Sequence, residues 1–389
     1  MADHGAFESA QTPNRSRGRG RMEKLAPPVV GSLLLLFALV GLIGTAIRDP
    51  KPHDIPVGLV GPPPAAQQIA TAFGSSAPGA FMFTSYGSEA DARAAVDSRA
   101  VDGVVILGEA TPRIIVAGAA GDAATGVITA AFTNAFKAQG ATAQVEVVHP
   151  FAAGDAHGLI LFFVVVAVIV CSLVSQALLF GTVKDVRTRE RLGVLIGFSI
   201  LAGLVGMGTA AWIAGGYGSD LGFWAAVGLT ALASAAVGAA VAGCVRLLGA
   251  PGLALAALVV VLLDLVSSGG PVGSQLLPDF YRWLAPWMPA GPLYSSLRGA
   301  LYFDGAGLGV PVIVVTAWLV GGLILMLLGD LTRTGRRSGT VVQAPAARPH
   351  WRCHEQEGDR GRGGHGRRSL PPHALISARL ATKAGRCAG

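Results

Sequence analysis

Six long apolar stretches constrain what this 389-residue chain can fold into. A helix of about 20 apolar residues crosses the hydrocarbon core of a bilayer. The stretches that reach or approach this length are residues 29–47, 159–181, 194–216, 223–245, 252–268 and 308–329. Charged residues make up 14% of the chain, against about 25% in a soluble domain, which excludes a purely soluble enzyme. We therefore expect an α-helical polytopic membrane protein with six transmembrane helices.

The first stretch, residues 29–47, could be a retained anchor or a cleaved signal peptide. Its apolar core is longer than the roughly 7–15 residues of a signal peptide, and no A-x-A cleavage site ends it. We interpret it as a retained transmembrane helix that follows a basic cytoplasmic segment at 1–28. The other five stretches then form a helix bundle over residues 158–331.

Lysine and arginine residues predict the orientation, because cytoplasmic loops of membrane proteins carry an excess of them. They cluster before the first stretch, between the second and third, and after the sixth. These clusters are Arg15, Arg17, Arg19, Arg21 and Lys24; Lys184, Arg187, Arg189 and Arg191; and Arg333, Arg336 and Arg337. The loop 217–222, which would lie on the opposite side, contains none. We expect a multi-pass protein of the cell membrane with both termini in the cytoplasm.

This orientation places residues 48–157, between the first two stretches, outside the cytoplasm. Short alternating segments replace the long apolar runs there, which is typical of an α/β domain. Strands are predicted at 55–61, 81–86, 101–108, 113–118 and 144–149, with helices from residue 62, after residue 88 and at 121–139. Ser88 can cap its helix, with Asp91 three residues on. About 110 residues suffice for a separate core.

The net charge of +7 belongs to the end of the chain. Residues 332–389 hold 12 Lys/Arg and 3 Asp/Glu, a balance of +9, so the remainder has a balance of −2. The basic balance therefore does not indicate a nucleic-acid partner. We expect 332–389 to be a basic, disordered cytoplasmic tail that attracts anionic membrane lipids.

Two other interpretations of the tail remain open. Its histidines and cysteines could bind a metal; these residues are His350, Cys353, His354 and Cys387. However, the tail contains neither the short paired spacings of zinc sites nor an apolar period around which a site could fold. Alternatively, the Arg-, Gly- and Pro-rich text of 340–389 could come from a shifted reading frame of GC-rich DNA. A clean reading frame on resequencing would refute that idea.

Motifs for catalysis are missing from the sequence. There is no G-x-x-x-x-G-K-[ST], H-E-x-x-H, G-x-S-x-G or EF-hand spacing, and no CxxC. Cys171 and Cys244 lie within apolar stretches, and Cys353 and Cys387 lie in the tail. None of the four lies in the segment placed outside the cytoplasm, so no disulfide framework is predicted. We expect neither enzyme activity nor a cofactor or metal in this chain.

Asp264 is the only carboxylate deep within an apolar stretch. Such residues often mark ion or substrate paths through a membrane. The alternative is that Asp264 lies near the outer end of a short helix, capped by Ser267 and water. Both interpretations remain open at this point.

The segment 182–193 is short, highly charged and predicted to be cytoplasmic. As a helix, it would display Arg187 and Arg191 one turn apart. Its basic residues are sufficient as a topology signal. They could also form a docking surface for a cytoplasmic partner, since the two roles are compatible.

The connection 269–307 is aromatic-rich, interrupted by prolines and too polar to span a membrane. Amphipathic rings favour the membrane–water interface, and backbone that is not helical is tolerated at membrane depth only against protein or a water-filled cavity. We expect this segment either to pack over the bundle as a lid or to form an amphipathic surface helix.

This arrangement resembles the membrane subunits of type-2 ABC transporters, most closely the phage-infection-protein-like (YhgE/Pip-like) subgroup. The resemblance covers about residues 22–332 and is carried by I-P-V-G-L-V-G at 55–61, E-A-D-A-R-A-A-V at 89–96 and V-D-G-V-V-I-L at 101–107. It is also carried by the proline-bounded aromatic stretch with Leu277, Pro278, Phe280, Pro286, Pro289, Leu297 and Arg298.

The resemblance implies an export permease that works as a homodimer or paired permease, driven by a separate P-loop ATPase. It implies that 182–193 is the ATPase-coupling loop, through Lys184, Asp185, Arg187, Arg189, Glu190 and Arg191. It also implies an external re-entrant segment at 277–302, with Pro278, Phe280, Trp283, Pro286, Trp287, Pro289 and Arg298. Because the spans carry almost no charge, an amphiphilic or hydrophobic cargo is expected.

Two rival functions remain. The chain could be a receptor or envelope-assembly scaffold that acts through its external domain and needs no ATPase. It could also be a proton-driven exporter that uses Asp264, an idea that depends on a single residue.

Overall fold

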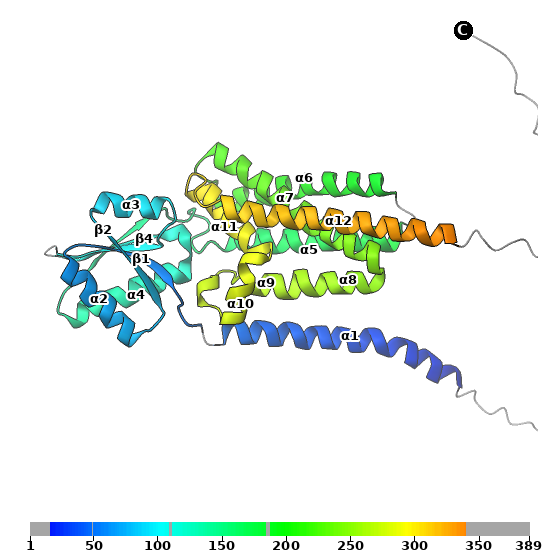
Figure 1. The fold of residues 1–389 in the computed structure, drawn as a ribbon, viewed down its shortest axis with the longest axis horizontal. Helices are drawn as coiled ribbons and strands as arrows, with labels where there is room; N and C mark the ends of the chain where they lie inside the picture. Colours follow the sequence, from blue (N-terminus) through cyan, green and yellow to red (C-terminus); the bar gives the residue numbers. More distant parts are fainter. Residues whose placement is uncertain (1–15, 49, 109–110, 184–186, 340–389) are drawn as a thin grey trace, which may run out of the picture. The chain divides into compact units, whose positions relative to one another are not determined.

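The computed structural model describes residues 16–48, 50–108, 111–183 and 187–339. Helices make up most of this part of the chain (Figure 1). The elements are α1 Ser16–Ile47, β1 Ile55–Val60, α2 Pro63–Ser76, β2 Phe81–Tyr86, α3 Glu89–Asp97, β3 Gly103–Ile106, β4 Arg113–Ala117, η1 Gly118–Ala120, α4 Asp122–Ala138, β5 Gln144–Val148, α5 Leu159–Thr182, α6 Thr188–Ala214, α7 Asp220–Leu248, α8 Ala250–Ala257, η2 Leu258–Asp264, α9 Leu265–Ser267, η3 Ser274–Leu276, α10 Asp279–Leu284, η4 Ala285–Trp287, α11 Ala290–Tyr302 and α12 Gly309–Gly339.

Six helical segments of the described chain are long and apolar enough to cross a membrane, which confirms the helical polytopic class. They are Val29–Ala46, Leu159–Thr182, Thr188–Ala214, Asp220–Leu248, Ala250–Ser267 and Gly309–Thr332. The third begins six residues before the predicted 194, because the charged residues from Thr188 onward already belong to the first turns of α6. The fifth combines α8, a π-helical segment (η2) and α9.

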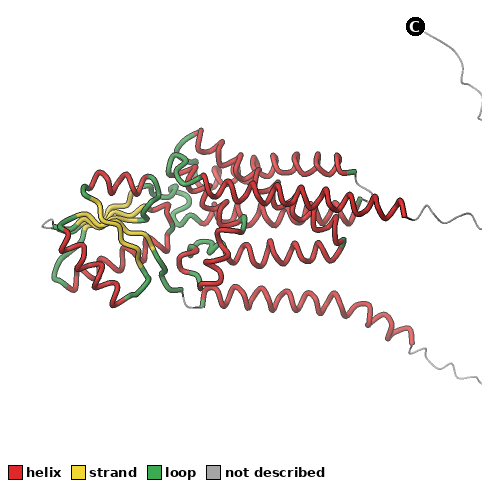
Figure 2. The backbone as a smooth tube through the Cα atoms, viewed as in Figure 1, coloured by secondary structure: helices red, strands yellow, loops and turns green. Residues whose placement is uncertain are grey.

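Residues 55–148 contain all the strands of the described chain, which Figure 2 draws in yellow. They form one sheet in the order β2-β1-β3-β4-β5. β1 pairs in parallel with β2 and β3, β4 pairs in parallel with β5, and β3 and β4 are antiparallel neighbours. All five predicted strands are confirmed, with ends within two residues of those expected.

Both faces of the sheet are covered by helices, because its central strands alternate apolar side chains between two cores. Ile55, Val57 and Leu59 of β1 face a core that also contains side chains of α2 and α4. Val104 and Ile106 of β3 face the opposite core, under α3. The result is an α/β/α domain, with α3 on one side of the sheet and α2 and α4 on the other (Figure 1).

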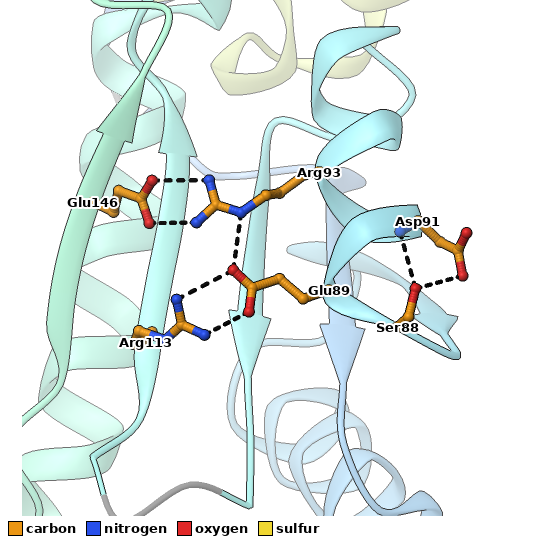
Figure 3. Close-up of polar contacts among 6 residues, drawn as sticks. All are labelled: Ser88, Glu89, Asp91, Arg93, Arg113 and Glu146. Carbon is orange, nitrogen blue, oxygen red and sulfur yellow. Dashed lines mark hydrogen bonds and ion pairs between the residues drawn. The ribbon is translucent and has the colours of Figure 1, made fainter.

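The predicted cap of α3 is confirmed. Ser88 Oγ accepts a hydrogen bond of 3.1 Å from the Asp91 amide and donates one of 2.7 Å to its carboxylate (Figure 3). The hydroxyl satisfies an N–H that the first turn of a helix leaves without a backbone partner.

A charged network joins α3 to the far strands of the sheet (Figure 3). Arg93 donates to both carboxylate oxygens of Glu146 at 2.8 and 2.6 Å and to Glu89 at 2.9 Å. Arg113 donates to both oxygens of the same Glu89, at 3.1 and 2.5 Å. These arginines hold the pKa of Glu89 below its usual value, with Arg113 contributing most. Because the four side chains are partly exposed, we interpret the network as support for the fold rather than as a binding site.

In the helical part, α7 is the central helix and contacts α5, α6, α11 and α12. Small residues allow α7 and α12 to approach closely. A Cβ built on Gly243 would lie 2.8 Å from the Gly322 carbonyl oxygen, and one built on Gly322 would lie 2.4 Å from the Ala240 nitrogen. The hydroxyls of Ser172 and Ser234 hydrogen-bond at 2.9 Å between α5 and α7.

Candidate functional site

The most specific polar arrangement lies where the α/β domain meets the helices, and we call it the arginine junction. It consists of Arg99, Asp102, Ala120, Gln275, Ser295, Arg298 and Ala306. Arg99 lies two residues after the end of α3 and has φ 61°, a left-handed backbone that is uncommon outside glycine. Its guanidinium donates to the Ser295 carbonyl and hydroxyl oxygens, both at 3.0 Å, and to the Ala306 carbonyl at 3.4 Å.

A second arginine crosses the junction in the opposite direction. Arg298 of α11 donates to the Ala120 carbonyl, at the end of η1 in the α/β domain. Its guanidinium carbon also lies 4.6 Å from the ring centroid of Tyr294, one turn earlier in α11. Each side of the junction therefore contributes one arginine, and each arginine binds main-chain oxygen atoms of the other side.

Gln275 of η3 forms a third connection. Its side-chain amide donates to Asp102 Oδ2 at 3.0 Å, and its carbonyl accepts from the His53 amide at 3.0 Å. Asp102 lies just before β3, so the sheet places this carboxylate beside the helical connection. Burial raises its pKa, although Gln275 and the nearby arginines oppose the shift.

Apolar packing continues across the same junction. Phe303, 3% exposed, belongs to the core beneath α3, and Tyr302 packs beside it. The preceding helix, α11, contributes Leu293, Tyr294 and Leu297 to the core of the bundle. One helix is therefore bound to the bundle by its apolar side chains and to the α/β domain by its C-terminal half.

A cavity of about 630 Å³ lies within the junction. The charged and polar side chains of its wall include those of His53, Arg99, Asp102, Gln275, Arg282 and Arg298. The first turns of α12 complete it with Val310, Pro311 and Val314. It is therefore partly basic and partly apolar.

The electrostatics of the cavity are dominated by arginine. Burial, followed by the like charge of Arg298, lowers the pKa of Arg99 to about 10. Because this value is still well above neutral pH, Arg99 remains charged at neutral pH and contributes positive charge to the wall of the cavity. An anion would interact favourably with it.

The structure shows which groups contact Asp264, and its role in an ion or substrate path stays a prediction. Its side chain is fully buried, and Oδ1 accepts a hydrogen bond of 2.8 Å from the Ala290 amide, at the first residue of α11. Ser267 does not cap the carboxylate, because its hydroxyl donates to the Asp264 main-chain carbonyl instead. Asp264 therefore fixes the start of α11 by accepting a hydrogen bond from an N–H that the first turn of a helix leaves without a backbone partner.

The segment 182–193 is not one helix. α5 ends at Thr182, Arg187 has an extended backbone, and α6 begins at Thr188. Arg187, Arg189 and Glu190 are exposed, whereas Arg191 is only 5% exposed. Arg187 and Arg191 thus do not form one surface, while Lys184 and Asp185 lie outside the described residues.

Nearby, Asp330 of α12 accepts from Arg246 of α7 and, at 2.5 Å, from Thr188 Oγ1. The first residue of α6 is therefore bound to α12, and through Asp330 it is connected to α7. Sequence reasoning did not predict this cluster.

The aromatic segment divides into two parts. Phe280, Trp283 and Trp287 are 56–67% exposed, as expected for rings at a membrane interface, whereas α11 is largely buried. Two prolines mark element boundaries, since Pro278 precedes α10 and Pro289 precedes α11, whereas Pro286 lies within η4. Two of the predicted re-entrant residues, Pro286 and Arg298, line the cavity. Arg298 is the one with a charged side chain.

Arg99, Asp102 and Gln275 were missed by sequence reasoning. Arg99 follows the end of α3, Asp102 precedes β3 and Gln275 lies in the short helix η3, and no motif marks any of them. Among the described residues there is no group of three or more His, Cys, Asp or Glu that could hold a metal; His350, Cys353, His354 and Cys387 of the tail lie outside that part of the chain. No family model matches the sequence, and no curated protein matches it either.

Proposed function

We propose that the chain is the membrane-spanning permease subunit of an exporter that moves an amphiphilic or hydrophobic cargo with energy from a separate ATPase. Six apolar helices and the resemblance described above support this function. In this proposal the termini are cytoplasmic and the α/β domain is external.

The observation that carries the proposal is the position of α11. This helix packs against α5, α7 and α12 and is bound to the α/β domain through Arg99 and Arg298. A rearrangement of the spanning helices would therefore move the external domain as well. A simple membrane anchor would not need such a connection.

At the opposite ends of the helices, the proposed coupling surface consists of the exposed Arg187, Arg189 and Glu190. Thr188 connects this surface to α7 and α12 through Asp330 and Arg246. Force applied by a partner to the start of α6 would thus reach α12 directly and α7 through Asp330.

Purification of the tagged full chain in mild detergent, followed by mass spectrometry, tests the proposal. We expect a stoichiometric P-loop ATPase, and its loss in the double variant Arg187→Gln/Arg189→Gln. Arg48→Gln is the matched control, since it removes an exposed arginine that directly follows α1 and is not part of the proposed coupling surface. No ATPase in the wild-type preparation, or equal retention by all three proteins, would refute the permease function and favour a receptor or scaffold.

A further inference from the structure

The wall of the arginine-junction cavity contains hydrogen-bond donors that the described structure leaves without a partner. Arg99 and Arg298 use main-chain carbonyls, and Arg282 lies 3.6 Å from Asp54 without a closer carboxylate among the described residues. Nε of Arg298 and Nη1 of Arg282 are buried in the described structure without a hydrogen-bond partner. A buried unpaired donor costs about 1–3 kcal/mol, so a ligand that brings acceptor oxygens would be stabilised here.

The side chains of the cavity carry an excess of positive charge. Arg99, Arg282 and Arg298 contribute three positive charges, against the two carboxylates of Asp54 and Asp102. Asp54 is 67% exposed, so water screens much of its charge. Guanidinium groups bind phosphate and carboxylate groups through paired N–H donors.

One wall of the cavity leads onto an apolar surface. Val310 of α12 lines the cavity and is 71% exposed, and Ile313, one turn further, is 68% exposed. The exposed side of the same helix continues through Val320, Ile324 and Leu327. A ligand held at the cavity could therefore lay an acyl chain along α12, within the hydrocarbon layer.

We infer that this cavity binds the anionic headgroup, a phosphate or carboxylate, of a membrane amphiphile whose apolar chain lies along α12. The inference depends on the proposed function only for the idea that this amphiphile is the cargo. It narrows the cargo from amphiphiles in general to anionic ones. The binding site itself needs no ATPase.

Native mass spectrometry of the full chain in detergent tests the inference, with added phosphatidylglycerol or phosphatidylcholine as probes. We expect a preference of about tenfold for phosphatidylglycerol, which corresponds to one charge-assisted hydrogen bond. Arg282→Gln should remove most of that preference. This variant leaves the hydrogen bonds of Arg99 and Arg298 across the junction in place, so the α/β domain should stay folded, which an unchanged thermal midpoint would verify.

Arg48→Gln is the matched control, because Arg48 is exposed just after α1 and does not line the cavity. It should keep the preference. Equal binding of the two lipids, or an equal loss in Arg48→Gln and Arg282→Gln, would overturn the inference. Thermal stabilisation by inorganic phosphate but by neither lipid would show a soluble-anion site and would also overturn it. The ATPase pull-down uses other residues and no lipid probe, so the two proposals fail independently.

Discussion

Replacement of Gly322 by alanine should destabilise the bundle, although alanine is the better helix former. The added Cβ would lie 2.4 Å from the Ala240 nitrogen, whereas ordinary van der Waals contact begins at 3.4 Å. α12 and α7 must therefore separate by about 1 Å. Both atoms in contact belong to rigid parts of a helix, so no flexible side chain can relieve the overlap.

The magnitude follows from two opposing effects. Overpacking of this kind costs about 1–3 kcal/mol, and more when backbone is displaced, while Gly→Ala in a helix gains up to about 1 kcal/mol. We expect a net loss of about 2 kcal/mol, which would lower the thermal midpoint of the purified protein by about 5 °C. Fluorescence-detected unfolding in detergent measures this directly.

The adjacent Gly321 provides a matched control on the same helix. A Cβ at that position meets nothing within 4 Å, so Gly321→Ala should leave the thermal midpoint unchanged or raise it slightly. If the two variants unfolded at the same temperature, the close packing of α7 and α12 would be refuted.

Three further predictions concern other parts of the molecule. Arg99→Gln should increase hydrogen exchange at the base of the α/β domain and lower the free energy of unfolding by about 2–4 kcal/mol, because several charge-assisted hydrogen bonds disappear. Arg93→Gln, in an exposed network, should lower the free energy of unfolding by at most about 1 kcal/mol. Because the pKa of Glu89 is lowered in the folded state, its ion pairs stabilise the domain above its usual pKa of 4.5 and are lost as the pH falls through the lowered value. The thermal midpoint should therefore decrease as the pH is lowered below about 4.5. This decrease should be less steep in the Glu89→Gln variant. Asp264→Asn, which keeps an acceptor for the Ala290 amide, should preserve stability and transport. Asp264→Leu should lower the free energy of unfolding by about 1–3 kcal/mol. Abolished transport in a stable Asp264→Asn protein would favour a proton-driven exporter.

The α/β domain was predictable because its local signals agree with its final packing. The strands place successive side chains on opposite faces of the sheet, and helices cover both faces. The pattern of apolar residues in the sequence therefore matches the burial of β1 and β3. The cap at Ser88 depends on residues only three positions apart. Such short-range interactions can be recognised without the rest of the fold.

The junction could not be predicted in the same way. Arg99 and Ser295 are 196 positions apart, and the arginine binds main-chain atoms that every residue possesses. Similarly, an apolar run predicts a spanning helix but not its π-helical turn at Leu258–Asp264. Arg191 illustrates the same limit, since a charge that looks like surface in the sequence is buried by neighbouring helices.

The use of carbonyl oxygens at the junction also affects how related sequences can diverge. Ala120 and Ala306 take part through their main-chain oxygen atoms, so many substitutions at these positions would preserve the hydrogen bonds. Coevolution between an arginine and a complementary acidic side chain is therefore not expected there. Distant homologues could retain these two carbonyl contacts while sharing little beyond two arginines and the backbone geometry around them.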